Sequence, residues 1–301
     1  MSRLSRVVAS VAASALVLGG GVLGTTAAQA EDAAPSGNYV SFGDSIPSNP
    51  TVLDVVMAKV KGTHPELPIQ VEAVDGCAHG GDNVGKRVAA KTGLTLSDYS
   101  CPGATAYTPP SPQDPIPHNM FSQQVDRALG DGALTPDTKL VSVVIGVNDT
   151  YQKSNLQRPQ EERLDLYHKE VSAQIDRIRE AAPNATVVMV GYPDETDGGN
   201  YTCATNLLGQ TSHWYFPAVR YYQEELRTEQ RAVAEEKGLP YLDMADEINI
   251  EKNNSGCLNI DPGQRLNAAI FDDSGLHNLA GHLTGPGNEY YAERISSFYQ
   301  H

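Results

Sequence analysis

The chain has few basic residues and no cluster of them, which argues against a nucleic-acid partner. Lysine and arginine number 22 among 301 residues, against 37 aspartates and glutamates, so the formal net charge is −15. Nucleic acids are bound by clustered lysine and arginine side chains, because these neutralise phosphates. The 27 glycines and 19 prolines follow no period, which excludes collagen and repeat arrays. A hydrophobic share of 40% predicts a packed globular core.

Beyond its first thirty residues the sequence lacks any apolar run of the roughly 20 residues that a membrane span requires. The start itself has two arginines, an apolar stretch over residues 7–24 and the small-residue site Ala28-Gln29-Ala30, the three parts of a secretory signal peptide. Serines and three consecutive glycines interrupt the apolar stretch, which favours a cleaved leader over a membrane anchor. We therefore expect cleavage after Ala30 and a secreted, monomeric single domain over residues 31–301, without stable membrane insertion.

Cysteines are also few, and none has a metal-binding spacing. The four are Cys77, Cys101, Cys203 and Cys257. In an oxidising compartment an even number of cysteines favours disulfides, and four allow three pairings. We favour nearest neighbours, Cys77 with Cys101 and Cys203 with Cys257. A zinc site is disfavoured because CxxC and paired CxxH spacings are missing.

No motif for a cofactor is present. The glycine pairs Gly80-Gly81 and Gly198-Gly199 match neither a P-loop nor a dinucleotide fingerprint. Residues 194–200 are rich in oxygen ligands, but no glutamate follows at the spacing of a calcium loop. We interpret them as a polar loop and expect neither cofactor nor metal.

Apolar patterning predicts an α/β fold. Strands are expected at residues 38–42, 94–100, 140–145, 186–190 and 241–244. Helices are expected at residues 160–182, 216–237 and 288–299. Strands that alternate with helices predict a parallel sheet covered by helices on both faces. The proline-rich stretch 108–117 is interpreted as a surface loop.

Three loops contain residues with catalytic chemistry. Ser45 follows the first predicted strand, Asn148 follows the third, and His282 precedes the last helix. A serine on a tight turn can act as a nucleophile, an asparagine amide can stabilise an oxyanion, and a neutral histidine can carry protons. Each has a common structural explanation when taken alone: a helix cap, a polar turn and a surface histidine.

Taken together, these loops resemble the SGNH (GDSL) hydrolase family. Gly-Asp-Ser, then Gly-x-Asn-Asp, then His-Leu-Thr-x-x-Gly-Asn-x-x-Tyr-Ala occur in that order between Tyr39 and Ile295. The segment at residues 101–105, Cys-Pro-Gly-Ala-Thr, is similar to the Cys-Ser-Gly-Ala-Thr stretch of secreted actinobacterial lipases in the family. The resemblance implies a three-layer, flavodoxin-like α/β/α sandwich, an acyl-enzyme intermediate and no metal.

The resemblance also implies roles for individual residues. Ser45 would be the nucleophile, and His282 would act as general base and then as general acid. The backbone N–H groups of Ser45 and Gly103, together with the side-chain amide of Asn148, would form the oxyanion hole. Apart from the resemblance, Trp214, Tyr221 and Tyr222 are candidates for lining an acyl pocket, although packing on a helix face or in a loop is the favoured explanation for them.

The sequence departs from the family pattern at the triad acid. That acid lies three residues before the histidine, and Leu279 occupies the position here. We therefore expect a Ser–His dyad whose imidazole is oriented by a backbone carbonyl. Asp272, Asp273 and Asn278 remain alternative orienting groups.

His277 competes with His282 for the catalytic role. Gly287 lies five residues after His282, as the motif requires, whereas no glycine stands five residues after His277. Asp273 lies four residues before His277, one more than the family spacing. The motif therefore favours His282.

Three functions are compatible with these residues. We expect a secreted esterase or lipase that acts on small-molecule or lipid esters. The alternative is a deacetylase or acyltransferase acting on cell-envelope glycans or glycolipids, which would use the same catalytic set. A catalytically inactive binding module of the same fold is supported only by Leu279.

Overall fold

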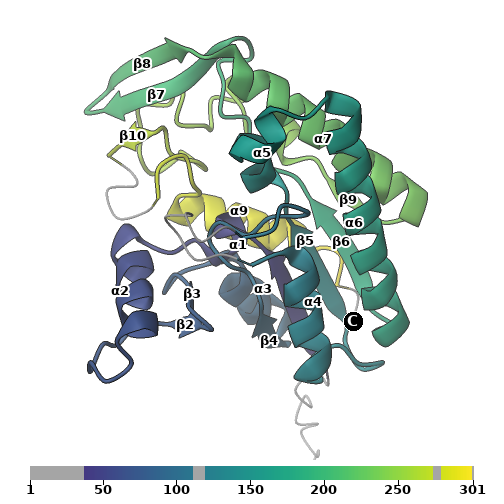
Figure 1. The fold of residues 1–301 in the computed structure, drawn as a ribbon. Coiled ribbons are helices and arrows are strands. Elements are labelled where there is room, and N and C mark those ends of the chain that lie inside the picture. Colours follow the sequence, from purple (N-terminus) through teal and green to yellow (C-terminus); the bar gives the residue numbers. More distant parts are fainter. Residues whose placement is uncertain (1–36, 111–118, 274–278, 300–301) are drawn as a thin grey trace, which may run out of the picture. The chain divides into compact units, whose positions relative to one another are not determined.

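A parallel sheet of five strands forms the centre of the structure, a computed structural model that describes residues 37–110, 119–273 and 279–299 (Figure 1). The strand order is β4-β1-β5-β6-β9, and every neighbouring pair is parallel. In that order the strands are Thr95–Asp98, Asn38–Gly43, Leu140–Val144, Thr186–Val190 and Tyr241–Leu242. The predicted parallel sheet is confirmed, with the last strand shorter than expected because Met244 already begins a helix.

The central strands end at the same level, which places their following loops side by side. All five residues of β5 are buried, as expected of an apolar run covered on both faces. Tyr39 on β1 pairs with Leu140, and the register continues to Gly43 opposite Val144. The loops after β1 and β5 therefore leave the sheet next to each other, at its carboxyl edge.

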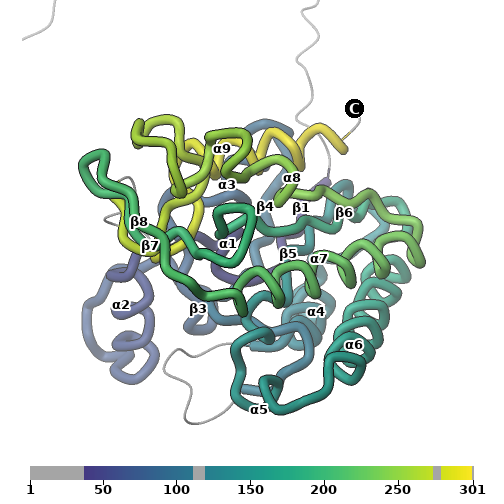
Figure 2. The backbone as a smooth tube through the Cα atoms, turned by 90° about the horizontal axis from the view of Figure 1, so that it is seen from above, coloured from purple at the N-terminus to yellow at the C-terminus, as the bar shows by residue number. Residues whose placement is uncertain are grey.

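Helices cover both faces of the sheet, which confirms the expected α/β/α sandwich (Figure 2). One face carries α3 (Val84–Thr92), α8 (Met244–Glu247) and α9 (Gly285–Ser296). The other carries α4 (Phe121–Gly130), α6 (Gln160–Ala181) and α7 (Pro217–Lys237). Among the described residues, no helix has both the length and the apolar character needed to cross a membrane.

The remaining elements include three short helices, one longer helix and two small sheets. The helices are α1 (Ser45–Ser48), α2 (Val52–Thr63), α5 (Lys153–Leu156) and a 3₁₀ helix at Val147–Tyr151. A two-stranded ladder pairs β2 (Ala73–Val74) with β3 (Cys77–Ala78). A second, three-stranded sheet has the order β10-β7-β8, formed by Phe271–Asp272, Tyr201–Leu207 and Gln210–Tyr215.

The last helix begins earlier than its sequence pattern indicates. The pattern predicts residues 288–299, whereas α9 spans Gly285–Ser296. The Thr284 side chain accepts a hydrogen bond from the Gly287 backbone N–H and so caps the helix three residues upstream. Pro286 is tolerated there because the first turn of a helix does not need its N–H.

Most of the proline-rich stretch 108–117 lies outside the described residues.

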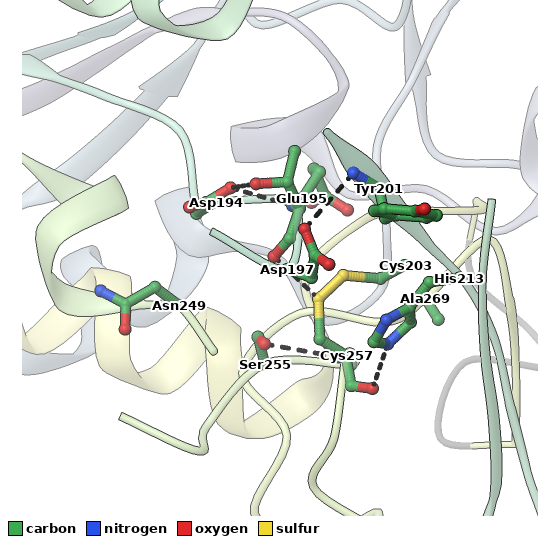
Figure 3. Close-up of a disulfide and its surroundings, with 12 residues drawn as sticks. Asp194, Glu195, Asp197, Tyr201, Cys203, His213, Asn249, Ser255, Cys257 and Ala269 are labelled. Carbon is green, nitrogen blue, oxygen red and sulfur yellow. Dashed lines mark hydrogen bonds between the residues drawn. A yellow bond between two sulfur atoms is a disulfide. The ribbon is translucent and has the colours of Figure 1, made fainter. Parts of the chain in front are cut away.

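Two disulfides link neighbouring cysteines in the chain. Cys77 pairs with Cys101, which joins β3 to the segment after β4. Cys203 on β7 pairs with Cys257, and both are buried beside Ala269 (Figure 3). On the chain-entropy argument, a loop of 54 residues closed by the second bridge contributes about 4 kcal/mol to stability.

Gly287 provides a test of how tightly α9 is seated. A Cβ at this position would lie 1.7 Å from the Leu266 carbonyl oxygen, so Gly287→Ala should lower the free energy of unfolding by about 3 kcal/mol. Gly62 on α2 faces open space, and Gly62→Ala should instead raise it by about 0.5–1 kcal/mol. Urea unfolding of both variants gives the comparison. Equal effects would show that the close approach to Leu266 does not constrain α9.

Candidate active site

The turn after β1 exposes Ser45 at the start of a short helix. Gly43 has φ +147, and a Cβ there would lie 2.3 Å from the Val144 carbonyl oxygen, so only glycine fits. Asp44 then caps α1 by accepting a hydrogen bond from the Ile46 N–H at 2.9 Å. Ser45 is thereby fixed as the first helical residue, with its hydroxyl directed to the cavity described below.

Gln124, a buried glutamine on α4, holds this turn with two hydrogen bonds. The Gly43 N–H donates to Gln124 Oε1 at 2.9 Å, and Gln124 Nε2 donates to the Gly43 carbonyl at 2.8 Å. The side-chain amide thus satisfies both backbone polar groups of Gly43. Sequence patterns did not single out Gln124, because a polar residue on a helix is normally exposed.

Ser45 and His282 are in direct contact although 237 residues separate them. His282 Nε2 lies 2.7 Å from Ser45 Oγ, and His282 Nδ1 lies 2.8 Å from the Ala280 carbonyl oxygen. A carbonyl can only accept, so Nδ1 carries the hydrogen. In the neutral ring Nε2 is then the acceptor for the Ser45 hydroxyl proton. The orienting group is therefore a backbone carbonyl, the arrangement expected from Leu279.

The other candidate acids are engaged elsewhere. Asp272 Oδ1 and Asp273 Oδ1 lie 2.7 Å and 2.5 Å from Nη1 of the buried Arg265. Asp272 Oδ2 also accepts the Ala269 N–H at 2.9 Å. Both carboxylates thus neutralise a buried guanidinium. His277 and Asn278 lie outside the described residues.

The groups expected to bind an oxyanion line the same cavity. Gly103 has φ +82 in the loop that follows the Cys101 bridge. Asn148 Nδ2 donates to the Ala104 carbonyl at 2.8 Å, and Tyr151 donates its hydroxyl to Asn148 Oδ1. These two contacts fix the amide plane, and an amide nitrogen has a second hydrogen to offer.

Asp149 connects the loops that contain Gly103 and Asn148. Its carboxylate accepts the Ala106 N–H at 2.6 Å, the Thr108 N–H at 2.9 Å and the Thr108 hydroxyl at 2.6 Å. Burial raises the pKa of Asp149 to about 6, against the lowering effect of these donors. The sequence offered a signal, the aspartate of Gly-x-Asn-Asp, but gave it no role.

Tyr192 links the serine turn to the Asn148 loop. Its hydroxyl donates to Asp44 Oδ2 at 2.6 Å and accepts the Val147 N–H at 3.3 Å. Burial raises the pKa of Asp44 to about 7, although the Tyr192 hydrogen bond acts in the opposite direction. No motif marked Tyr192; its only sequence signal is its place just after the strand at residues 186–190.

Asn49 secures the histidine loop to the end of α1. It adopts the left-handed conformation with φ 32, which asparagine tolerates better than most residues. Its Nδ2 donates to the Leu283 carbonyl at 3.0 Å and to Asn288 Oδ1 at 2.9 Å. The residue next to His282 and the first turn of α9 are therefore tied to the serine helix.

A cavity of about 660 Å³ adjoins these groups, and Ser45, Gly103, Asn148 and His282 all line it. Its remaining wall is mostly apolar and includes Ile46, Val147, Leu156, Val219 and Leu226. Of the three aromatic candidates, Tyr222 lines the cavity, whereas Trp214 and Tyr221 are not among its lining residues.

Glu195 is an acidic residue in the cavity wall that the sequence did not assign. Its Oε1 accepts a hydrogen bond from Asn267 Nδ2 at 3.0 Å. Burial raises its pKa to about 8, so the carboxyl is largely protonated at neutral pH.

In the described part of the chain, no three His, Cys, Asp or Glu side chains are grouped as metal ligands would be.

The sequence model of the GDSL-like lipase/acylhydrolase family matches residues 41–289, which include all four cavity groups named above. The chain belongs to this family. It is accordingly a carboxylic ester hydrolase. A search of curated proteins returns no match.

Two solved structures similar to this GDSL hydrolase come from Streptomyces. Phospholipase A1 from Streptomyces albidoflavus NA297 is 17% identical, with a TM-score of 0.50, and the match covers 88% of this chain and 100% of that one. The extracellular lipase from Streptomyces rimosus is 19% identical, with a TM-score of 0.51 and coverage of 88% and 100%. At this identity the similarity establishes the fold.

The surroundings of His282 predict a low pKa for its ring. Desolvation lowers the pKa of His282 below its ordinary value of 6.5, and the hydrogen bond to Ala280 opposes this only in part. The imidazole should therefore be neutral at pH 7 and able to accept a proton. A proton NMR titration, with the signal assigned by its absence in His282→Gln, should give a pKa below 6.5. A value above 6.5 would point to a nearby carboxylate as a partner of the ring.

Proposed function

We propose that this GDSL hydrolase is an exported serine esterase or lipase that cleaves carboxylic esters through an acyl-enzyme on Ser45. The observation that carries the proposal is the 2.7 Å contact between Ser45 Oγ and a neutral His282, both of which line a mostly apolar cavity. A hydroxyl paired with an oriented base is the arrangement that activates a serine nucleophile.

The reaction uses two proton transfers through His282. Ser45 Oγ attacks the ester carbonyl carbon while its proton passes to His282 Nε2. The alcohol then leaves with that proton, and the Ser45 acyl-enzyme remains. Water attacks the acyl-enzyme, His282 again accepts the proton, and the acid is released as Ser45 recovers its hydrogen.

Negative charge develops on the carbonyl oxygen in both steps. We assign its stabilisation to the N–H groups of Ser45 and Gly103 and to the Asn148 side-chain amide, all of which line the cavity. A single such donor lowers the barrier by about 3–4 kcal/mol. The imidazolium formed in each step is held by the Ala280 carbonyl, a dipole in place of the usual carboxylate.

The cavity and the comparisons favour esters whose acyl group is a hydrocarbon chain longer than acetyl. A large, mostly apolar wall suits hydrocarbon better than an acetyl group carried by a glycan, which makes a deacetylase the weaker candidate. The two Streptomyces structures are described as a phospholipase A1 and an extracellular lipase. The signal peptide predicted over residues 1–30 and the two disulfides support export, and we expect residues 31–301 to form a single, monomeric mature domain.

Three histidine and serine variants test the dyad. Ser45→Ala and His282→Ala should each lower kcat for p-nitrophenyl butyrate by about 10⁴-fold or more, because the nucleophile or its base is lost. His277→Ala, and Asp273→Asn as a matched acid control, should retain kcat within about threefold of the parent. Loss of activity in His277→Ala with His282→Ala still active would reverse the assignment.

Asn148→Ala tests the oxyanion hole separately from the nucleophile. We expect kcat to fall by about 10²–10³-fold with little change in KM, because the amide acts on charge that develops only in the transition state. Labelling of Ser45 by a fluorophosphonate, together with an unchanged thermal midpoint, would show that the dyad is still in place. A kcat equal to that of the parent would exclude Asn148 from the hole.

A further inference from the structure

The hairpin of β7 and β8 is a region without charged side chains in a strongly acidic protein. Residues 198–219 contain no aspartate, glutamate, lysine or arginine, although charged residues make up 20% of the chain and its net charge is −15. The hairpin reaches away from the central sheet (Figure 1). Charged residues normally keep such projecting strands soluble, so their absence here requires an explanation.

Large apolar side chains take the place of the missing charges. Leu208, at the turn of the hairpin, is 88% exposed, and Trp214 is 51% exposed. We call the exposed set the hairpin patch: Tyr201, Leu208, Trp214, Tyr215, Phe216 and Phe271. Single exposed apolar residues are common on proteins, but neighbouring ones mark an interaction site.

The patch covers both faces of the small sheet. Tyr201 pairs with Tyr215 across the ladder, and their rings meet edge to face at 5.3 Å. Trp214, one residue earlier, points to the opposite face, where its ring lies 6.0 Å from that of Phe271. A flat protein partner would cover one face only, whereas insertion into a soft apolar phase covers both.

The hairpin is held firmly at its base and near its tip. The Cys203–Cys257 bridge joins β7 to the loop that follows α8, and His213 Nε2 lies 3.1 Å from the Cys257 carbonyl oxygen (Figure 3). At the turn, the Leu208 N–H donates to Asp273 Oδ2 at 2.8 Å. The exposed side chains are therefore presented by a fixed backbone.

The patch is continuous with the active-site cavity. Phe216, which follows β8 directly, belongs to the patch and also lines the cavity that contains Ser45. Val219 and Tyr222, on the first turns of α7, continue the cavity wall from there. An apolar chain could thus move from the hairpin to Ser45 along Phe216, Val219 and Tyr222, within a cavity wall that is mostly apolar and that also includes Glu195 and Arg227.

We propose that the hairpin patch docks the protein on a lipid surface with neutral or zwitterionic headgroups. Tryptophan and tyrosine rings favour the boundary between headgroups and hydrocarbon, and Leu208 would reach past them into the acyl region. The net charge of −15 opposes binding to anionic lipid. That the docked surface also supplies the ester rests on the function proposed above; the docking itself does not.

Trp214 allows a direct test, because it is the only tryptophan in the chain. The experiment uses the mature chain with Ser45→Ala, so that lipid is not consumed, and phosphatidylcholine vesicles. We expect the Trp214 emission to shift to shorter wavelength as vesicles are added, with weaker binding to phosphatidylglycerol vesicles. Leu208→Asp should reduce vesicle partitioning by about tenfold or more. Leu67→Asp, a matched change at a leucine that is 42% exposed after α2, should leave it unchanged.

The outcomes separate docking from catalysis. With Ser45 present, Leu208→Asp should hydrolyse the soluble ester p-nitrophenyl butyrate within about twofold of the parent rate, because Leu208 is not among the residues that line the cavity. The docking proposal is overturned by vesicle partitioning that Leu208→Asp and Leu67→Asp leave equal, or by no shift with vesicles. A shift produced by an oligosaccharide or by protein concentration alone would also overturn it. Vesicle binding without hydrolysis of any soluble ester would refute the proposed function and leave docking intact.

Discussion

The close backbone approach of β1 to β5 is the constraint on which the site depends. Gly43 comes so near the Val144 carbonyl that no side chain fits between them, and the Asp44 N–H donates to that carbonyl at 3.1 Å. The chain must therefore turn sharply at Gly43, which leaves Ser45 at the carboxyl edge of the sheet. Gln124 then fixes the turn through Gly43, and Tyr192 fixes it through Asp44. The sheet thus places Ser45 directly, whereas Gly103 and His282 reach the same cavity from loops.

Burial determines the charge of the site as much as its shape. His282 is kept neutral, whereas Asp44, Asp149 and Glu195 have pKa values raised to about 7, about 6 and about 8. Each of these acids binds its proton more tightly in the folded chain than in the unfolded one. Their contribution is therefore most favourable below pH 4 and is lost as pH rises through these raised values. The site is built from neutral or hydrogen-bonded groups, in contrast to the acidic surface.

Long sequence patterns were sufficient for the sheet and for two of its covering helices. The apolar runs at residues 140–145 and 186–190 are strands because both faces are buried, and α6 and α7 match the bounds that their periodicity indicates to within one residue. The sequence did not predict the hairpin, because apolar and polar residues do not alternate simply over Tyr201–Tyr215. The aromatic rings of this segment are exposed on both faces of the small sheet. The start of α9 was misplaced because a threonine cap, a local hydrogen bond, decides it.

The sequence by itself determined the family and the candidates for chemistry, because a nucleophile, an amide, a glycine and a histidine in a fixed order are local features of the chain. Only the tertiary structure decided which groups meet. It brought His282 to Ser45 across 237 residues, gave the orienting role to the Ala280 carbonyl, and engaged Asp272 and Asp273 with Arg265. A backbone carbonyl has no sequence signature, since every residue carries one, and its function depends entirely on where the fold directs it.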